Sequence, residues 1–232
     1  SIANRVIRDV CESKGALFYR VFDKQNQLHS DYKDNKYHCS YRTPRENYHF
    51  DIQMNGSHQT LNAATAIKAI EVMKRDSKLN SETDNRVISL DSISRGIREN
   101  FVPGRIEEIE ASPPIIIDGG HNVDGIAVLA SHLKTRRFRN CTLIFGVLRD
   151  KKYKKMVEIL LPYIKHVLLV TPRSNRALPL QKLSPLFIEK QVTEYGDNYS
   201  EALERARVIG KQILITGSIY MIGEMRNLII GE

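Results

Sequence analysis

The sequence predicts an α/β protein whose C-terminal region is a doubly wound, mostly parallel sheet, with a smaller α/β region before it. Near-continuous apolar runs alternate with amphipathic stretches after residue 105, which is typical of parallel strands covered by helices on both faces. Each main run ends close to glycine, hydroxyl or charged residues, the composition expected at the ligand-binding edge of such a sheet. The chain of 232 residues is long enough for one large domain or two small ones.

The region before residue 102 lacks this regular alternation. Its expected elements are a helix over 2–14, a strand over 16–22, a polar hairpin-like segment to about 53, an alanine-rich helix after Gly56, a polar loop over 81–85 and a helix over 89–100. The alanine-rich helix is indicated by Leu61, Ala64 and Ile67, which recur at helical spacing. The turn at Pro103–Gly104 then marks a boundary, so we expect one domain over 1–101 and another over 102–232.

The second domain should contain five strand and helix pairs. The expected strands are 115–117, 142–147, 167–171, 191–195 and 213–216, and the expected helices are 123–133, 153–164, 180–188, 200–209 and 219–230. Right-handed crossovers between parallel strands then give an open sheet with helices on both sides. Ligands of such a sheet bind outside the carboxyl ends of its strands, so we expect the site along that edge.

Composition excludes some classes of protein and leaves others open. Apolar residues make up 41% of the chain, an ordinary globular share, and no apolar run reaches the roughly 20 residues that a membrane span needs. The 3 cysteines are far apart, which fits a reducing cytoplasm better than a disulfide framework. The net charge of +8 is compatible with nucleic-acid binding, with a small polyanionic ligand, or simply with solvated surface charges.

The strongest local signal is the turn Asp118-Gly119-Gly120-His121-Asn122, between a buried strand and a helix. Asn122 is suited to cap the helix, and the helix amino end favours a phosphate or carboxylate. Asp118 could accept hydrogen bonds from a ribose, and His121 could donate to a phosphate or stabilise developing charge. The alternative is that Asp118 and Asn122 only hold the turn together.

Three further residues are candidates with equally plain alternatives. Asn62 could present a donor and an acceptor to an adenine edge, or be an ordinary polar residue of the first helical turn. Arg105 could bind a phosphate through two hydrogen bonds, or be a surface arginine of a linker. Ser218 opens the last helix, where it could face a carboxylate or phosphate or serve as a simple cap.

Common catalytic motifs are missing from the sequence. It contains no G-x-x-x-x-G-K-[ST] phosphate loop and no G-x-G-x-x-G fingerprint. H-E-x-x-H and G-x-S-x-G are also absent. The residues of this chain alone therefore predict only half of a nucleotide site.

The order of the motifs resembles the folylpolyglutamate synthase and dihydrofolate synthase family, within the Mur-type ligases. The matching segments are His58-Gln59-x-x-Asn62-Ala63, Pro103-Gly104-Arg105, Asp118-Gly119-Gly120-His121-Asn122, Gly146 to Lys151 and Gly217-Ser218-Ile219-Tyr220 leading to Gly223-Glu224. The Asp-Gly-x-His-Asn turn favours folate over cell-wall substrates. The departures are Val102 where the family usually has Trp, Gly120 where it has Ala and Val123 where it has Pro.

The resemblance implies a Rossmann-like Mur ligase C-terminal domain, preceded by the last part of a central ATP-binding domain. It implies an ATP- and Mg²⁺-dependent ligase in which a folate or dihydropteroate carboxylate becomes an acyl phosphate that L-glutamate attacks. By analogy Asn62 contacts the adenine, Arg105 a phosphate and Asp118 the ribose. His121 would lie near the phosphates or the reacting centre, and Ser218 near the incoming glutamate.

The family places its phosphate loop, magnesium ligands and a carbamylated lysine upstream of the matching part. We therefore expect a piece of a longer cytoplasmic protein that binds nucleotide weakly, is inactive alone, is monomeric and has no nucleic-acid or membrane partner. Two alternatives remain: a Mur-type ligase acting on a cell-wall precursor, and a non-catalytic module that binds nucleotide or nucleic acid. A panel of substrates distinguishes the cell-wall ligase from the folate ligase, and salt-dependent binding to DNA or RNA would indicate the binding module.

Overall fold

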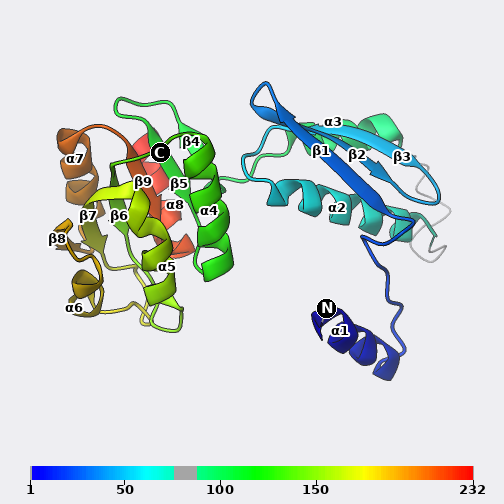
Figure 1. Cartoon of the computed structure of the whole chain (residues 1–232), viewed down its shortest axis with the longest axis horizontal. Coiled ribbons are helices and arrows are strands. Elements are labelled where there is room, and N and C mark those ends of the chain that lie inside the picture. Colours follow the sequence, from blue (N-terminus) through cyan, green and yellow to red (C-terminus); the bar gives the residue numbers. More distant parts are fainter. Residues whose placement is uncertain (1, 76–87, 232) are drawn as a thin grey trace. The chain divides into compact units, whose positions relative to one another are not determined.

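The computed structural model describes residues 2–75 and 88–231, which fall into two compact units (Figure 1). Unit 1 comprises residues 1–53 and 59–100, and unit 2 comprises residues 54–58 and 101–232. Each unit has its own sheet. The polar loop expected over 81–85 lies outside the described residues.

Unit 1 is built around a small antiparallel sheet of strand order β1-β2-β3. Its elements are α1 (Ile2–Ser13), β1 (Gln27–Lys33), β2 (Lys36–Arg42), β3 (Asn47–Ile52), α2 (His58–Arg75, whose first residue belongs to unit 2) and α3 (Leu90–Glu99). The helices expected over 2–14, after Gly56 and over 89–100 are therefore confirmed. The hairpin-like segment contains the whole three-stranded sheet.

The strand predicted over 16–22 is wrong. The chain there has no regular secondary structure, and Leu17 is 79% exposed. Among the described residues no strand pairs with this segment, and an apolar run cannot form a ladder without a partner. The sheet uses the more polar segments instead, because β2 and β3 place Tyr41, Tyr48 and Phe50 on one buried face.

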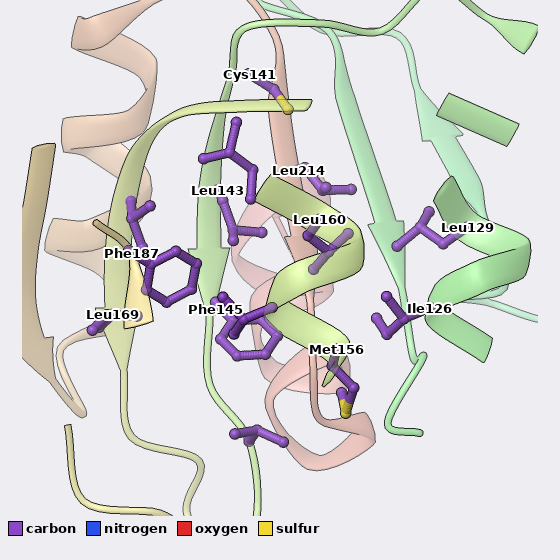
Figure 2. Close-up of a cluster of buried hydrophobic side chains, with 14 of the residues drawn as sticks. Ile126, Leu129, Cys141, Leu143, Phe145, Met156, Leu160, Leu169, Phe187 and Leu214 are labelled. Atoms are coloured by element: carbon purple, nitrogen blue, oxygen red, sulfur yellow. The ribbon is translucent and has the colours of Figure 1, made fainter. Parts of the chain in front are cut away.

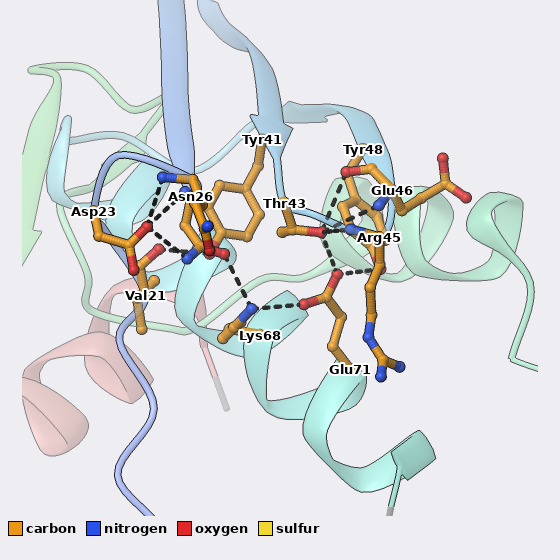
Figure 3. Close-up of polar contacts among 11 residues, drawn as sticks. Val21, Asp23, Asn26, Tyr41, Thr43, Arg45, Glu46, Tyr48, Lys68 and Glu71 are labelled. Atoms are coloured by element: carbon orange, nitrogen blue, oxygen red, sulfur yellow. Dashed lines mark hydrogen bonds and ion pairs between the residues drawn. The ribbon is translucent and has the colours of Figure 1, made fainter.

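A polar network links helix α2 to the sheet of unit 1, as Figure 3 shows. The Glu71 carboxylate is 5% exposed and accepts hydrogen bonds from Thr43 Oγ1 at 2.6 Å, Lys68 Nζ at 2.9 Å and Tyr48 Oη at 3.1 Å. Burial alone would raise the pKa of Glu71, but these donors together hold it below its ordinary value. Lys68 also donates to Asn26 Oδ1 at 3.0 Å, so the network reaches the start of β1.

Unit 2 contains a six-stranded sheet of order β4-β5-β9-β6-β7-β8 (Figure 1). Its strands are β4 (Glu107–Ile109), β5 (Ile115–Asp118), β6 (Cys141–Phe145), β7 (Ile164–Val170), β8 (Gln191–Gly196) and β9 (Ile213–Thr216). Its helices are α4 (Val123–Thr135), α5 (Tyr153–Leu160), α6 (Leu180–Leu183), α7 (Tyr199–Ile209) and α8 (Ile219–Ile230), with short 3₁₀ turns η1 (Leu161–Tyr163) and η2 (Ser184–Leu186). All neighbouring strands are parallel except β4 and β5.

Successive residues of the central strands point to opposite faces of this sheet, where they enter two separate cores. Leu143 and Phe145 of β6 lie in the core beneath α4, α5 and α6, whereas Ile144 between them lies in the core beneath α7 and α8. Figure 2 shows the first of these cores, with Leu160 and Phe187 facing the strand residues. Helices therefore cover both faces, which confirms the predicted doubly wound, mostly parallel sheet.

Three details of unit 2 differ from the prediction. The helix expected over 153–164 ends at Leu160 and is followed by the 3₁₀ turn η1, which contains Pro162, and by β7 from Ile164. Strand β4 was not expected, because its three residues are too few for a visible pattern and follow a turn. The helix predicted over 180–188 is broken into α6 and a 3₁₀ turn, since Pro185 cannot continue an α-helix. None of the helices in the described part of the chain is long and apolar enough to cross a membrane.

Candidate functional site

The carboxyl ends of three neighbouring strands meet at one edge of the sheet in unit 2. The backbone pairing places Asp118 of β5 beside Thr216 of β9, and Thr216 beside Phe145 of β6. Arg105 precedes a residue bonded to Asp118, and Ser218 follows Thr216 by two positions. The predicted gathering of polar loops at this edge is therefore present, with Arg105, Asp118, His121 and Ser218 all within unit 2.

Asp118 is held by the backbone on both of its carboxylate oxygens. Oδ2 accepts a hydrogen bond from the Ile106 amide at 3.0 Å, and Oδ1 accepts one from the Gly120 amide at 2.8 Å. The residue is only 5% exposed, and burial raises its pKa although both hydrogen bonds and the charge of Arg105 act in the opposite direction. In this structure Asp118 joins the Arg105 loop to the turn after β5.

The loop around Arg105 is fixed on both sides of that residue. The Gly104 carbonyl accepts a hydrogen bond from the Gly119 amide at 2.7 Å, and the Ile106 carbonyl accepts one from Asn55 Nδ2 at 3.0 Å. The Arg105 side chain itself is exposed. A fixed backbone that carries an exposed guanidinium beside a helix amino end is well suited to hold a phosphate.

The helix that follows Asp118 is capped as the sequence predicts. Asn122 has an extended backbone, and its Oδ1 accepts a hydrogen bond from the Gly125 amide at 2.8 Å, which confirms it as the N-cap of α4. His121 is half-buried, and its Nδ1 lies 3.0 Å from the Gly119 carbonyl oxygen. A carbonyl can only accept, so Nδ1 carries the proton and Nε2 of the neutral ring is left as an acceptor.

Ser218 has a hydroxyl whose hydrogen-bonding capacity is unused within the described structure. It is 1% exposed, stands at the N-cap of α8, and its Oγ has no partner among the described residues. Gly217 before it has φ +116°, and a Cβ there would lie 2.4 Å from the Gly146 carbonyl oxygen. Only glycine therefore permits this close approach between the ends of β9 and β6.

Asn62 belongs to unit 1, whereas the other four candidates belong to unit 2. It is on the second turn of α2, is exposed, and donates from Nδ2 to Gln59 Oε1 at 3.0 Å. This contact fixes the orientation of its amide, so that its Oδ1 faces away from Gln59. Its predicted contact with an adenine stays a prediction.

His58, a residue without an expected role, lies close enough to Arg105 for that charge to act on its ring. Its Nδ1 is buried without a partner in the described residues, and burial together with the nearby charge of Arg105 lowers its pKa. Both effects keep the ring neutral beside the arginine. The signal in the sequence was its position at the start of a helix and within Gly56-Ser57-His58, but Arg105 is 47 positions away and no local pattern relates the two.

The basic residues that follow β6 and β7 lie on loops bonded to each other. The Arg149 amide donates to the Arg176 carbonyl at 2.9 Å, and Asp150 forms ion pairs with Lys151 and Arg176. Arg173 is paired with Glu224 of α8 at 2.5 Å. The structure thus gathers these charges at the same edge as the four candidates.

Two cavities within the described part of the chain lie away from the candidate residues. One cavity of about 300 Å³ lies at the opposite edge of the unit 2 sheet, where Glu108, Arg136 and Gln212 line it. A second of about 220 Å³ lies between β3 and α3 in unit 1. Neither includes a candidate residue, and the described residues hold no group of three His, Cys, Asp or Glu suited to a metal ion.

Comparison with known proteins gives matches over most of the chain. Residues 104–219 match the family model described as Mur ligase, glutamate ligase domain. A dihydrofolate synthase/folylpolyglutamate synthase of Bacillus subtilis is 29% identical over 97% of this chain and 51% of its own length. A folylpolyglutamate synthase of Lacticaseibacillus casei is 32% identical over 78% of this chain and 40% of its own length. The chain thus spans about half the length of these relatives or less.

Solved structures show the same fold. A Mycobacterium tuberculosis folylpolyglutamate synthase complexed with ADP and AMPPCP has a TM-score of 0.82, 21% identity, and coverage of 98% of this chain and 52% of its own. Escherichia coli FolC in complex with DHPP and ADP has a TM-score of 0.76, 20% identity, and coverage of 97% of this chain and 50% of its own. At these identities the likeness establishes the architecture alone.

Proposed function

Because the chain belongs to the folylpolyglutamate synthase/dihydrofolate synthase family of Mur-type ligases, we propose that it forms part of an ATP-dependent glutamate ligase. The reaction would add L-glutamate to a carboxylate of folate or dihydropteroate. The observation that carries the proposal is the convergence of Arg105, Asp118, His121 and Ser218 at one sheet edge, within a region that matches a glutamate ligase domain.

The proposed chemistry has two balanced steps. A carboxylate oxygen of the acceptor attacks the γ-phosphorus of ATP, and ADP leaves with the electron pair of the broken P–O bond. The amine of glutamate then attacks the acyl carbon, phosphate leaves, and one amine proton passes to a base or to solvent. Both steps develop negative charge on phosphate oxygens, which cations and helix amino ends stabilise.

The nucleotide side of the site is assigned to Arg105, Asp118 and Asn62. Arg105 is exposed on a fixed loop, so its guanidinium is available for a phosphate. Both oxygens of Asp118 already accept a backbone amide, and their remaining lone pairs could accept from ribose hydroxyls. Asn62 would contact the adenine. The solved complexes of the similar M. tuberculosis and E. coli proteins with ADP support a role for nucleotide in this family.

The part of the site where the acyl phosphate meets the incoming glutamate is assigned to His121 and Ser218. With Nδ1 bonded to the Gly119 carbonyl, a protonated His121 would present Nε2–H to a phosphate oxygen, and a neutral one could take the amine proton. Ser218 Oγ needs a partner in its buried position, and a carboxylate of the incoming glutamate would provide it. Both residues stand at helix amino ends, which favour anions.

The described residues do not fit a metal site of their own, so no step of this proposal depends on a metal held by them. Mg²⁺ would arrive with the nucleotide and screen its phosphates. We assign residues 1–101 to the last part of a central ATP-binding domain and 102–232 to the glutamate ligase domain. We also propose that the protein is a cytoplasmic monomer. The 232-residue chain by itself would bind nucleotide weakly and would not catalyse glutamate ligation.

The substrate is tested with a panel offered to the full-length product of the gene. Dihydropteroate, tetrahydrofolate and a nucleotide-sugar peptide are supplied separately with ATP and labelled glutamate. Incorporation into either pterin supports the proposal and names the preferred acceptor. Incorporation into the nucleotide-sugar peptide alone would replace it with a cell-wall ligase, and turnover by the 232-residue chain by itself would contradict its proposed inactivity.

A further inference from the structure

The Arg105 loop has an unusual backbone that its surroundings must hold in place. Gly104 has φ +67° and Ile106 has φ +47°. A β-branched residue in the left-handed region is strained, and such strain persists only where neighbouring contacts over-determine it. All four backbone polar groups of Gly104 and Ile106 are bonded, to Glu107, Gly119, Asp118 and Asn55.

One of those four contacts depends on a helix far away in the sequence. Glu107 folds back over the loop, and its Oε2 accepts a hydrogen bond from the Gly104 amide at 2.7 Å. Arg226 of α8 donates from Nε to both oxygens of the same carboxylate, at 3.1 Å and 3.0 Å. Glu107 is 8% exposed, so its charge relies on Arg226 for compensation.

Helix α8 also contacts the loop directly. A Cβ at Gly104 would lie 2.6 Å from Cγ2 of Ile222, which shows how closely the loop follows the helix surface. Ile222 and Arg226 are one turn apart, so they lie on the same face of α8. The same helix begins after Ser218, the residue assigned to the incoming glutamate.

We propose that Arg226 and Glu107 are positioning residues that hold Arg105 at the nucleotide phosphates and join its loop to the helix that begins at Ser218. This inference rests on the proposed function and extends it, since neither residue was assigned a role by the motifs. Arg226 touches no substrate in this account. It acts through Glu107 on the backbone that carries Arg105.

The test measures the dissociation constant for ADP with Mg²⁺ by calorimetry, using the 232-residue chain and its variants. Arg226→Gln removes the partner of Glu107, and we expect ADP binding to weaken by about tenfold, because small displacements of a binding group are costly. The matched control is Arg205→Gln, which removes the same charge from an exposed position on α7. It should leave ADP binding unchanged.

A double-variant cycle identifies the route of the effect. If Arg226 acts through Glu107, Glu107→Gln combined with Arg226→Gln should weaken binding no more than the stronger single variant. Arg226→Lys restores the charge with a different geometry and should recover part of the affinity. Amide exchange at Gly104 should accelerate in Arg226→Gln even where the variant is otherwise folded.

The outcomes separate this inference from the proposed function. Failure of the unaltered chain to bind ADP, and of the full-length product to ligate glutamate, would count against the proposed function itself. Weaker ADP binding in Arg105→Gln, with unchanged binding and unchanged Gly104 exchange in a folded Arg226→Gln, would overturn the positioning role. Should Arg226→Gln fail to fold, Arg226→Lys decides: reduced affinity with faster Gly104 exchange supports the role, and unchanged values refute it.

Discussion

The Ile106 amide donates a hydrogen bond to Oδ2 of Asp118 at 3.0 Å, across twelve residues of sequence. This single contact joins the loop that carries Arg105 to the turn that carries His121. The contact gives a buried carboxylate at the end of an apolar strand a structural role. Burial there raises the pKa of Asp118. Asp118 keeps this structural role, whatever it does for a ligand.

Asp118→Asn should therefore destabilise the protein even without ligands. An amide side chain has one acceptor oxygen, so its NH₂ group must face either the Ile106 or the Gly120 amide. We expect a loss of about 1–3 kcal/mol in the free energy of unfolding, the cost of a buried polar group left unsatisfied. Urea titration followed by circular dichroism measures it, and an unchanged midpoint would contradict the structural role.

Arg105→Gln should weaken nucleotide binding far more than it lowers stability. The side chain is exposed, whereas a charge-assisted hydrogen bond to phosphate contributes about 1.5–3 kcal/mol, so the ADP dissociation constant should rise by roughly tenfold to a hundredfold. Calorimetry with ADP and Mg²⁺ measures the change. Arg207→Gln on α7 serves as the control of equal charge, and equal affinities in the two variants would remove Arg105 from the site.

Ser218 and Asn122 make a matched pair of helix caps with opposite expectations. Asn122→Ala should cost about 1 kcal/mol of stability, because its side chain caps the Gly125 amide. Ser218→Ala should cost less than about 0.5 kcal/mol, because its hydroxyl makes no cap hydrogen bond. Ser218→Ala should nevertheless raise the KM for glutamate in the full-length enzyme. If Ser218→Ala instead costs as much stability as Asn122→Ala and leaves the KM for glutamate unchanged, Ser218 is a simple helix cap.

Gly217→Ala should disrupt the site edge, whereas Gly223→Ala should not. At Gly217 a Cβ would stand 2.4 Å from a backbone carbonyl and the φ of +116° would be strained, so a loss of about 2 kcal/mol or more is expected. At Gly223, within α8, a Cβ meets nothing within 4 Å, and alanine should stabilise the helix by about 0.5–1 kcal/mol. Thermal unfolding of both variants checks the prediction: the melting temperature should fall in Gly217→Ala and rise in Gly223→Ala.

Acid should weaken unit 1 through Glu71. Its pKa in the folded protein lies below the ordinary value of about 4.3, so the folded state resists protonation and the unfolded state takes up the proton first. The stabilisation is present above the ordinary pKa and is lost as the pH falls through the lowered one. The protection of the α2 amides, taken as their exchange rate relative to that of an unstructured peptide at the same pH, should fall more in the unaltered protein than in Glu71→Gln as the pH is lowered from 6 to 3; an equal fall in the two would contradict this role of Glu71.

The sequence predicted unit 2 better than unit 1 for a physical reason. The strands of unit 2 are buried on both faces, so runs such as Ile115–Ile117 are apolar without interruption and easily recognised. The sheet of unit 1 has one exposed face, and β1 reads as a polar segment. The apolar segment over 16–22 therefore has the pattern of a strand, although no strand pairs with it among the described residues.

The candidate site could be predicted as far as local motifs reach. Asn122 as a cap and the gathering of strand ends follow from short patterns with known geometry. The hydrogen bonds of Arg226 to Glu107 and the electrostatic effect of Arg105 on His58 link residues far apart in the chain, and no spacing rule reveals them. The buried, unbonded hydroxyl of Ser218 likewise becomes visible only when its surroundings are known.

The most direct test of the account is ATP-dependent incorporation of labelled glutamate by the full-length product of the gene, with release of phosphate measured alongside. We predict one phosphate released for each glutamate added to dihydropteroate or tetrahydrofolate, with both signals reduced in Arg105→Gln at limiting ATP and in Ser218→Ala at limiting glutamate. A folded, full-length protein that adds no glutamate to either acceptor would contradict it.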